Sequence, residues 1–535
     1  MDIREVIKSN RLYFDGGAGT LLQSMGLESG EKPEYWNLKY PERIIEMHKR
    51  YLSAGANIIT TNTFGANREK FDNFEEIISA GIECAKKAAE NFENCFVAFD
   101  MGPTGKLLEP LGELKFEDAV SIFADNVKIA EKCGADLVII ETMNDAYETK
   151  AAVLAVKENS DLPVFVTNVF DETSKLMTGA SPLAMSALLE GLGVDAVGMN
   201  CSLGPDKLMP TIDEYLKYSS LPLIVNPNAG LPSVENGKTV YNIDADEFSD
   251  LMRIIAQKGA CILGGCCGTT PEYIKATIEK TKDIPYCYPT EKTHTVVSSY
   301  THGVLIGKKP QLIGERINPT GKKKLKEALK NNDLNYILNE GVTQAETGVA
   351  ILDVNVGLPE IDEVQMMKTA VSSLQAVTNV PLQIDTSDPK ALETALRIYN
   401  GKALVNSVNG KEESMTAVFP LVKKYGGAVI ALTLDEDGIP ETAEKRVEIA
   451  KKIIARAKEH GIDKKDIIVD PLAMTISSDT TNALTTLKAI SEIRKLGVYT
   501  SLGVSNISFG LPERQKINSA FFAIALENGL NLSIM

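Results

Sequence analysis

The feature that most constrains the fold is a repeated alternation between short apolar runs and amphipathic segments. In the first half of the chain the apolar runs are residues 12–14, 58–61, 96–99, 137–140, 164–167, 196–199, 223–225 and 262–263. Apolar residues recur at three- and four-residue spacing in the segments between them, such as 41–54, 117–132, 145–157 and 245–258. Continuous apolar strands that alternate with helices are typical of a parallel sheet covered by helices. Eight such units predict a closed (β/α)8 barrel.

An open, doubly wound sheet is the alternative, because residues 15–20 resemble a glycine-rich dinucleotide turn after the first strand. The stretch that begins at Gly17 lacks the third glycine of the G-x-G-x-x-G pattern. No acidic residue ends the second strand, although a dinucleotide fold needs one there. The open sheet also predicts fewer strands, so the pattern favours the barrel.

A second series of eight apolar runs follows, at residues 312–313, 351–354, 382–384, 403–405, 429–432, 467–469, 502–504 and 532–534. The sequence stops on or just after the eighth run, where such a barrel normally adds an eighth helix. We therefore predict an α/β fold of two (β/α)8 TIM barrels in tandem, the second lacking its final helix. We also expect the chain to be a fragment of a longer one.

The alternation of apolar runs and amphipathic segments stops between the two series. Residues 285–310 contain Pro285, Pro289 and Pro310, two of the four histidines, and a stretch rich in Ser, Thr and Tyr. Such composition is typical of an inter-domain linker. The predicted organisation is a first barrel at 1–284, a linker at 285–310 and a second barrel at 311–535.

Composition excludes several classes of protein. The formal net charge of −16 would repel a phosphate backbone, so we expect no nucleic-acid partner. No apolar run reaches the length of a membrane span, and the N-terminus lacks the basic start of a secretion signal. We therefore expect a cytoplasmic protein. Eight cysteines in 535 residues are too sparse for a disulfide framework, so clustered cysteines indicate metal binding or catalysis.

Three cysteines occupy the ends of predicted strands. Cys201 follows the sixth apolar run, and Cys266 and Cys267 follow the eighth within a glycine-rich stretch. Three thiols at the mouth of a barrel suit zinc with three protein ligands and one open position, and bound zinc activates a thiol substrate. A vicinal disulfide is the alternative for the adjacent pair, but it is strained and disfavoured in the cytosol. The other cysteines fit buried core positions: Cys84, Cys95, Cys133, Cys261 and Cys287.

The sequence around these cysteines resembles the homocysteine S-methyltransferase family. The matching segments are 264–271 (GGCCGTTP), 198–202 (GMNCS), 15–20 (DGGAGT), 61–64 (TNTF), 102–103 (GP), 141–142 (ET) and 227–230 (PNAG). The resemblance covers about residues 10–282 and implies a (β/α)8 barrel whose three cysteines bind zinc. It also implies that Asp15, Glu141 and Asn228 hold the amino-acid part of homocysteine. A zwitterion needs such groups, although Asp15 and Glu141 could equally be helix N-caps.

The second barrel has acids and amides where its predicted strands end. They are Glu315, Asn318, Asp353, Asn355, Asp385, Asn406, Asp470, Ser505 and Asn506. Each could be a loop cap, but together they form a ring suited to a neutral heterocycle rich in N–H donors. The segments 313–321, 353–355, 385–387, 406–407, 470–471 and 505–512 resemble the pterin-binding family, and within it the methyltetrahydrofolate–corrinoid methyltransferases. Residues 317–321 depart from the dihydropteroate synthase pattern, which argues against synthase activity.

The resemblance implies that Asp385, Asn406 and Asp470 bind the pterin and that Asn506 lies near its N5. We assign folate binding to these four residues with Glu315 and Asn318. Asn506 and Asp470 are the candidates for catalysis, because N5 must gain a proton or a strong hydrogen bond as its methyl leaves. The corrinoid acceptor, a cobalamin, needs a site outside this chain, since no Asp-x-His-x-x-Gly stretch is present.

Together the two modules resemble the N-terminal half of the cobalamin-dependent methionine synthases. The resulting hypothesis is methyl transfer from 5-methyltetrahydrofolate through cobalamin to zinc-bound homocysteine. The partners would be homocysteine, 5-methyltetrahydrofolate and a cobalamin-binding domain or corrinoid protein. Two alternatives are a homocysteine methyltransferase that uses betaine or another donor, with an auxiliary pterin domain, and a non-catalytic pterin or zinc module. The ring of acids and amides in the second barrel argues against the first of these.

Overall fold

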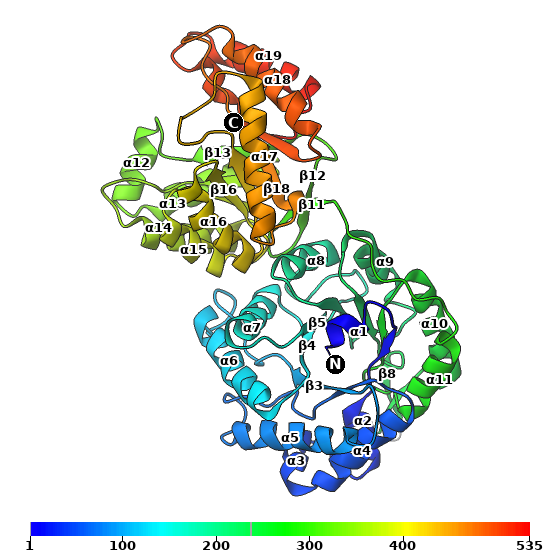
Figure 1. Cartoon of the computed structure of the whole chain (residues 1–535). Helices are drawn as coiled ribbons and strands as arrows, with labels where there is room; N and C mark the ends of the chain where they lie inside the picture. The colour runs from blue at the N-terminus through cyan, green and yellow to red at the C-terminus, as the bar shows by residue number, and fades with distance from the viewer. Residues whose placement is uncertain (1, 236–237) are drawn as a thin grey trace. The chain divides into compact units, whose positions relative to one another are not determined.

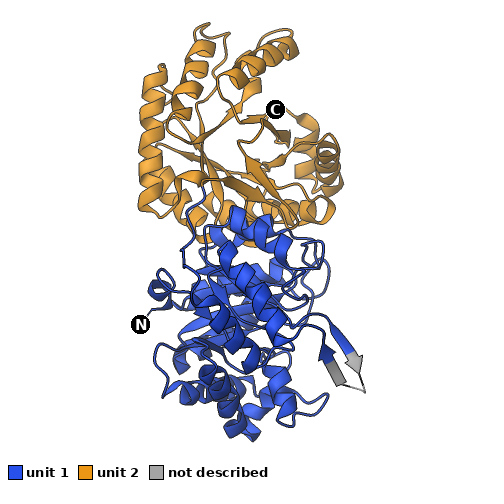
Figure 2. Cartoon of the chain, turned by 90° about the vertical axis from the view of Figure 1, so that its right-hand side faces the viewer, with its two compact units in different colours: residues 1–292 blue, residues 293–535 orange. Residues whose placement is uncertain are grey.

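The chain forms two compact units, Met1–Lys292 and Thr293–Met535 (Figure 2). A computed structural model describes residues 2–235 and 238–535. Both units are barrels of parallel strands surrounded by helices, as the alternating apolar pattern predicts. In the described residues no helix is both long enough and apolar enough to traverse a lipid bilayer.

The first barrel has the eight strands that the first series of apolar runs predicts. They are β1 (Leu12–Tyr13), β2 (Ile58–Thr60), β3 (Phe96–Met101), β4 (Leu137–Met143), β5 (Val164–Asn168), β6 (Ala196–Asn200), β7 (Leu223–Asn226) and β10 (Ile262–Leu263). The strand order is β1-β10-β7-β6-β5-β4-β3-β2. A parallel bridge between Phe14 and Ile58 joins the two ends of this sheet. The open doubly wound sheet is therefore the wrong alternative.

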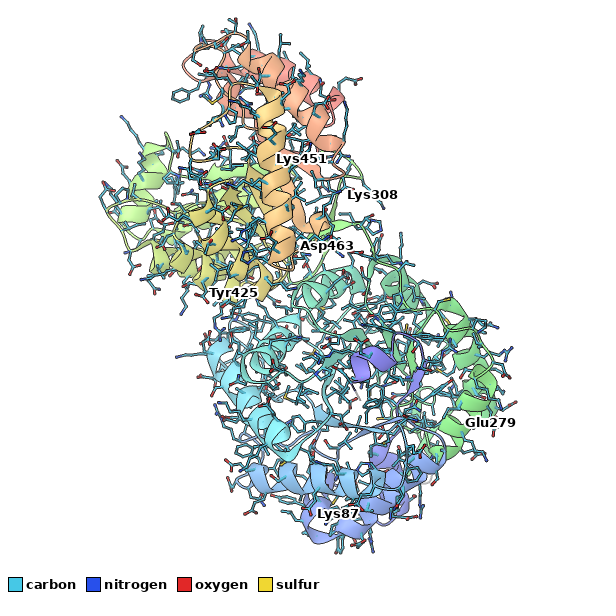
Figure 3. All side chains as sticks on the ribbon, in the orientation of Figure 1. Lys87, Glu279, Lys308, Tyr425, Lys451 and Asp463 are labelled. Carbon is cyan, nitrogen blue, oxygen red and sulfur yellow. The ribbon has the colours of Figure 1, made fainter. Side chains whose placement is uncertain are left out.

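Helices surround these strands in an outer ring (Figure 1). They are α2 (Ala18–Ser24), α3 (Trp36–Lys39), α4 (Pro41–Ser53), α5 (Phe74–Ala89), α6 (Phe116–Cys133), α7 (Ala146–Asn159), α8 (Pro182–Gly191), α9 (Met209–Tyr218), α10 (Ala245–Lys258) and α11 (Pro271–Thr281). Their apolar faces pack on the strands, while charged residues such as Lys87 and Glu279 lie on the outer side (Figure 3). A hairpin of β8 (Pro232–Glu235) and β9 (Lys238–Tyr241) follows β7.

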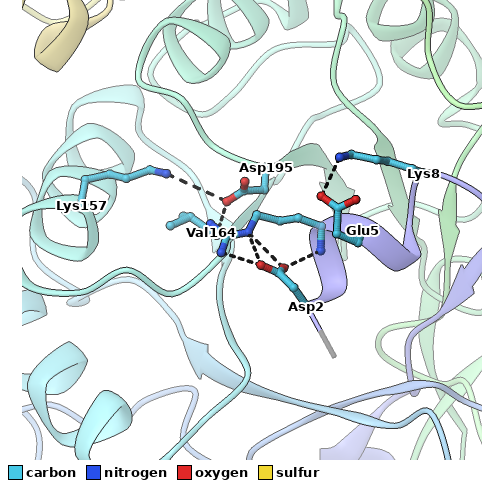
Figure 4. A network of polar contacts seen from close by, with 7 residues as sticks. Asp2, Glu5, Lys8, Lys157, Val164 and Asp195 are labelled. Atoms are coloured by element: carbon cyan, nitrogen blue, oxygen red, sulfur yellow. Dashed lines mark hydrogen bonds and ion pairs between the residues drawn. The ribbon is translucent and has the colours of Figure 1, made fainter. Parts of the chain in front are cut away.

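A short N-terminal helix covers one end of the first barrel. Helix α1 (Ile3–Val6) buries Ile3 and Ile7 in the same core cluster as the barrel residues Phe14 and Ile58. Asp2 caps this helix by accepting a hydrogen bond from the Arg4 backbone N at 2.9 Å, and it also pairs with the Arg4 side chain (Figure 4). This packing closes the N-terminal end of the strands, so the opposite end is free to carry a site.

The second barrel closes completely with eight strands, again as predicted. They are β13 (Gln311–Ile317), β14 (Ile351–Val354), β15 (Leu382–Asp385), β16 (Leu404–Asn409), β17 (Ala428–Leu432), β18 (Ile467–Asp470), β19 (Tyr499–Gly503) and β20 (Leu532–Ile534). Strand β20 pairs with both β13 and β19, and it is the last element of the chain. No helix of this chain therefore follows the eighth strand, as the sequence predicts.

Eight helices accompany these strands: α12 (Lys323–Lys330), α13 (Leu334–Glu346), α14 (Glu363–Val377), α15 (Pro389–Ile398), α16 (Glu412–Tyr425), α17 (Ala443–Glu459), α18 (Asn482–Arg494) and α19 (Arg514–Glu527). Helix α17 shows the usual division of faces. Its residues Ile449 and Ile453 are buried, whereas Lys451 is exposed (Figure 3). Consecutive mouth loops follow β17, β18 and β19.

A hairpin lies within the stretch that composition predicts as linker. Strands β11 (Thr295–Ser298) and β12 (Gly303–Ile306) pair antiparallel and share a core cluster with barrel residues such as Ile313. The Ser298 backbone N donates to Lys402 O at 2.9 Å, and Tyr399 OH donates to Ser298 O at 2.8 Å. The short apolar runs 296–297 and 304–306, rather than the Ser and Thr content, were the informative signal.

Replacing Gly401 with Ala should destabilise the second barrel. Gly401 has a φ of +145°, and a Cβ atom there would lie 2.3 Å from Ser298 O in the hairpin. The clash and the strained backbone should lower the free energy of unfolding by about 1 to 3 kcal/mol. Urea unfolding followed by circular dichroism measures this loss. Fluorescence of Trp36, the single tryptophan, should show an unchanged first barrel.

Gly438→Ala is the matched control. Gly438 has a φ of +95°, but a Cβ atom there meets no atom within 4 Å, so this variant measures backbone strain alone. Equal losses in the two variants would contradict the proposed packing of the hairpin against Gly401.

Candidate functional site

The structure brings Cys201, Cys266 and Cys267 together at the mouth of the first barrel. Their sulfur atoms all lie within 4.8 Å of one another, and the Cys201 and Cys267 sulfurs are 4.0 Å apart. Two thiols on zinc at about 2.3 Å, with tetrahedral angles, would be about 3.8 Å apart. The donor set and its spacing therefore fit a zinc ion with three cysteine ligands.

Local backbone geometry turns these thiols toward a common point. Cys201 and Ser202 both have left-handed backbones, with φ values of 61° and 55°. After β10 the backbone passes close to side chains of neighbouring segments. A Cβ atom at Gly264, for example, would lie only 2.6 Å from Asn226 Oδ1. A Cβ at Gly265 would lie 2.2 Å from Thr269 Oγ1. The glycines thus allow adjacent cysteines to leave the strand and face the same side, which alternating strand residues cannot do.

Polar groups orient the sulfur atoms. Asn228 Oδ1 accepts a hydrogen bond from the Cys267 backbone N at 3.1 Å, and its amide also bonds the Cys201 thiolate. The Asn200 amide reaches the Cys266 sulfur at 3.9 Å and Thr142 Oγ1 at 2.7 Å. Tyr241, at the end of β9, forms a hydrogen bond with Cys267.

The cluster shares negative charge unevenly. Hydrogen bonds from Cys266 and Cys267 lower the pKa of Cys201 to about 3. Hydrogen bonding to Cys201 raises the pKa of Cys267 to about 11 and that of Cys266 well above its usual range. One thiolate is therefore stabilised by two thiol donors, and a divalent cation would favour ionisation of all three.

Three carboxyl groups of the first barrel, Asp15, Asp100 and Glu141, lie close enough to interact through their charges. Asp15 accepts hydrogen bonds from Thr60, including one from its backbone N at 2.8 Å. Burial raises the pKa of Asp15 to about 7, and burial with the charges of Asp15 and Cys201 raises that of Glu141 to about 8. Asp100 is only 6% exposed, and among the described residues its Oδ1 has no hydrogen-bond partner. A ligand with an ammonium group would compensate these buried acids.

The N-cap alternative for Asp15 and Glu141 is wrong. Helix α2 begins after Gly17, and helix α7 takes Asp145 as its cap, whereas Glu141 lies inside β4. Asp100 and Tyr241 were not predicted from the sequence. Asp100 carries the same signal as the acids of the second barrel, since it directly follows the apolar run at 96–99. Tyr241 had no local signal, because a hairpin of unremarkable sequence brings it to Cys267.

The mouth of the second barrel gathers most of its predicted ring. Asp353 is 1% exposed and accepts a hydrogen bond from Gln383 Nε2 at 2.6 Å. Asn318 Nδ2 donates to Asp385 Oδ2 at 3.4 Å, and the register pairs Asp385 with Asn406. Burial raises the pKa of Asp385 to about 6, and burial with the nearby Asp385 charge raises that of Asp353 well above its usual range.

The remaining predicted residues lie on the same rim. The charge of Glu315 helps to raise the pKa of Asp353. The Glu315 backbone O accepts a hydrogen bond from Lys322 Nζ at 2.5 Å. Asp470 ends β18 and accepts hydrogen bonds from the backbone N of Leu472 and of Gly503. Burial raises the pKa of Asp470 to about 7. Asn506 is exposed in the 3-10 turn Val504–Ser508, which directly follows β19.

Two such barrels, each with a different set of donors at its mouth, define a two-module barrel enzyme. Residues 12–281 match the homocysteine S-methyltransferase family, and residues 314–535 match the pterin-binding enzyme family. The chain belongs to the homocysteine S-methyltransferase family and carries a pterin-binding module after that barrel.

Curated relatives align with the whole chain. The methionine synthase of Mycobacterium leprae (strain TN) is 32% identical over 581 aligned residues, which cover 100% of this chain and 48% of that protein. The methionine synthase of Mycobacterium tuberculosis (strain ATCC 25618 / H37Rv) is 31% identical over 574 residues, with the same coverage. This chain thus spans about half the length of these curated relatives. The apo homocysteine methyltransferase MmuM from Escherichia coli is 26% identical, with a TM-score of 0.43, over 51% of this chain and 97% of that chain.

Replacing Glu141 with Gln should make the stability of the first barrel less sensitive to pH. The pKa of Glu141 is about 8 in the fold and 4.5 in a model peptide. Between these values the folded barrel keeps a proton that the unfolded chain has released, so its free energy of unfolding falls as pH rises. The Glu141→Gln variant should reduce this decrease in the free energy of unfolding by up to ~1.4 kcal/mol per pH unit.

Urea titrations from about pH 5.5 to about pH 8, followed by Trp36 fluorescence, measure that slope. Glu279→Gln, at an exposed position on α11, is the control and should keep the slope of the original protein. An unchanged slope in Glu141→Gln would show that Glu141 is ionised in the folded barrel throughout this range.

Proposed function

We propose that the chain performs both substrate steps of methyl transfer from 5-methyltetrahydrofolate to homocysteine. The first barrel would bind homocysteine and the second would bind the folate. The methyl group would pass through a cobalamin held by a domain or protein outside this chain, giving methionine and tetrahydrofolate. The cysteine triad at a barrel mouth is the single observation that most strongly supports the proposal, because its donors and spacing suit zinc with a free position.

In the first barrel Cys201, Cys266 and Cys267 would hold the zinc. Bound zinc supplies a Lewis acid that keeps the homocysteine sulfur as a thiolate at neutral pH. Asn228 and Tyr241 fix the orientation of the cysteine sulfurs through the hydrogen bonds described above. Asp15 and Glu141 would bind the substrate ammonium, since burial makes their carboxylates costly without a cation.

In the second barrel the acids and amides would bind the flat pterin ring in its plane. Asp385, Asn406 and Asp470 offer acceptors for ring N–H groups, and Glu315 and Asn318 complete the rim. As the methyl group leaves, N5 keeps the electron pair of the broken bond and gains a proton. Asn506 with Asp470 would stabilise that change, because the pKa of Asp470 lies near neutrality and permits both protonation states.

The compartment follows from the same chemistry. All eight cysteines are free thiols in the structure. A zinc site of three thiolates needs a reducing environment, so we propose that the protein works in the cytoplasm.

Replacing Cys266 with Ala should separate the two steps. The variant should lose its zinc, falling from about one ion per chain to near zero, because two thiols remain. It should also lose methylation of homocysteine by added methylcobalamin, while methyl transfer from 5-methyltetrahydrofolate to added cobalamin persists. Metal analysis and the two half-reaction assays measure these effects.

Cys261→Ala is the matched control, because Cys261, directly before β10, is a fully buried thiol in the core cluster of the first barrel. It should keep zinc and both steps. If Cys266→Ala retains zinc and homocysteine turnover, the zinc assignment is incorrect.

Asp385→Asn should give the reciprocal result. The amide keeps the size of the side chain but replaces an acceptor by a donor, so affinity for 5-methyltetrahydrofolate should fall about tenfold or more. Calorimetric titration with 5-methyltetrahydrofolate measures the affinity. Homocysteine methylation by methylcobalamin should be unaffected, and a loss of both steps would argue against separate sites.

A further inference from the structure

We propose that Arg446 is a positioning residue that sets how Asp470 presents its carboxyl group to the pterin. This inference rests on the proposed function of the second barrel. Arg446 lies on α17, behind the loops that follow β17 and β18, and it has no motif that singles it out in the sequence. Its side chain is 1% exposed, which is unusual for an arginine.

Arg446 ties two mouth loops together. Its Nε donates to Pro440 O at 3.0 Å, in the loop after β17. Its Nη1 donates to Pro471 O at 2.9 Å and to Leu472 O at 2.8 Å, in the loop after β18. A planar guanidinium can direct several N–H groups at fixed angles, so one side chain fixes the distance between both loops.

The loop after β18 needs this support. Leu472 has a left-handed backbone with a φ of 65°, which is costly for a residue with a side chain. Its carbonyl oxygen accepts hydrogen bonds from Arg446 and also from Thr486 Oγ1 at 3.0 Å on α18. These two bonds hold the Leu472 carbonyl in place, and so they hold the peptide in its strained form.

The strained residue in turn holds Asp470. The Leu472 backbone N donates to Asp470 Oδ1 at 2.7 Å, so the orientation of Leu472 decides where this carboxyl oxygen lies. Thr433 N donates to the Asp470 backbone O at 3.1 Å and fixes the end of the strand. Arg446, Leu472 and Asp470 therefore form a chain of contacts from the outer helix to the rim.

Charge supports the same assignment. The hydrogen-bond partners of Arg446 given above are neutral oxygens, and Asp470 is a carboxyl group whose charge acts on Arg446. The positive charge of Arg446 lowers the pKa of Asp470 against the effect of burial. A buried cation behind the loop thus favours the carboxylate form, which accepts hydrogen bonds from ring N–H and amino groups.

The test uses the whole chain and calorimetric titration with 5-methyltetrahydrofolate. Arg446→Met keeps most of the buried volume but removes every donor, and it should weaken binding roughly tenfold. In the folate-to-cobalamin assay KM should rise by a similar factor, and kcat should fall as well, because the proposed function gives Asp470 a part in the change at N5. Arg446→Lys keeps the positive charge but lacks the planar guanidinium with its several N–H donors. Its affinity for 5-methyltetrahydrofolate should therefore lie between those of Arg446→Met and the original protein.

Two controls separate positioning from general stability. Arg456→Met removes an arginine from the same helix whose ion pairs are on the surface, and it should bind the folate normally. Homocysteine methylation by methylcobalamin, a reaction of the first barrel, should be unchanged in every variant. If Arg446→Met does not fold, Arg446→Lys carries the test.

A double-mutant cycle gives the decisive readout. Asp470→Asn should itself weaken folate binding, and adding Arg446→Met should then change affinity by less than about twofold, because both act through one contact. Normal binding by Arg446→Met, or a full tenfold loss on top of Asp470→Asn, would overturn the inference. Normal binding by Asp470→Asn would instead refute the role of Asp470 in the proposed function.

Discussion

The position of strand β7 between β6 and β10 determines whether the thiol cluster exists. Ile224 of β7 pairs with Gly198 on one side and with Ile262 on the other, so the two outer strands end at the same level. Beyond these pairs the Cys201 backbone N donates to Asn226 O, and the Cys266 backbone N donates to Pro227 O. Strand β7 thus aligns Cys201 with Cys267, although the two are 66 residues apart in the sequence. A change of register by one residue would turn these side chains to the other face.

The two barrels apply one architecture to different chemistry. In the first, soft sulfur donors stand beside buried carboxyls, and this combination suits a metal-bound thiol with an ammonium group. In the second, hard oxygen and nitrogen donors such as Asp353 and Asn318 line the rim, and they suit a planar heterocycle. Because the donor groups lie at the strand ends, the same fold serves both proposed steps.

Much of this could be predicted from the sequence, for physical reasons. Parallel strands buried on both faces give continuous apolar runs, so all sixteen barrel strands were visible, and their ends located Cys201 and Asp385. The β11–β12 hairpin was not predicted, because its two short strands lie in a stretch whose proline and serine content is typical of a linker. Tyr241 and Arg446 were also missed. Both act through contacts with residues distant in sequence, and neither belongs to a pattern that local spacing can reveal.

X-ray absorption at the zinc edge of the purified chain tests the central claim most directly. Before substrate is added, the metal should have three sulfur neighbours at about 2.3 Å and one lighter neighbour. Homocysteine should convert this to four sulfur neighbours. A chain that binds no zinc, or a metal already surrounded by four sulfurs without homocysteine, would contradict the account.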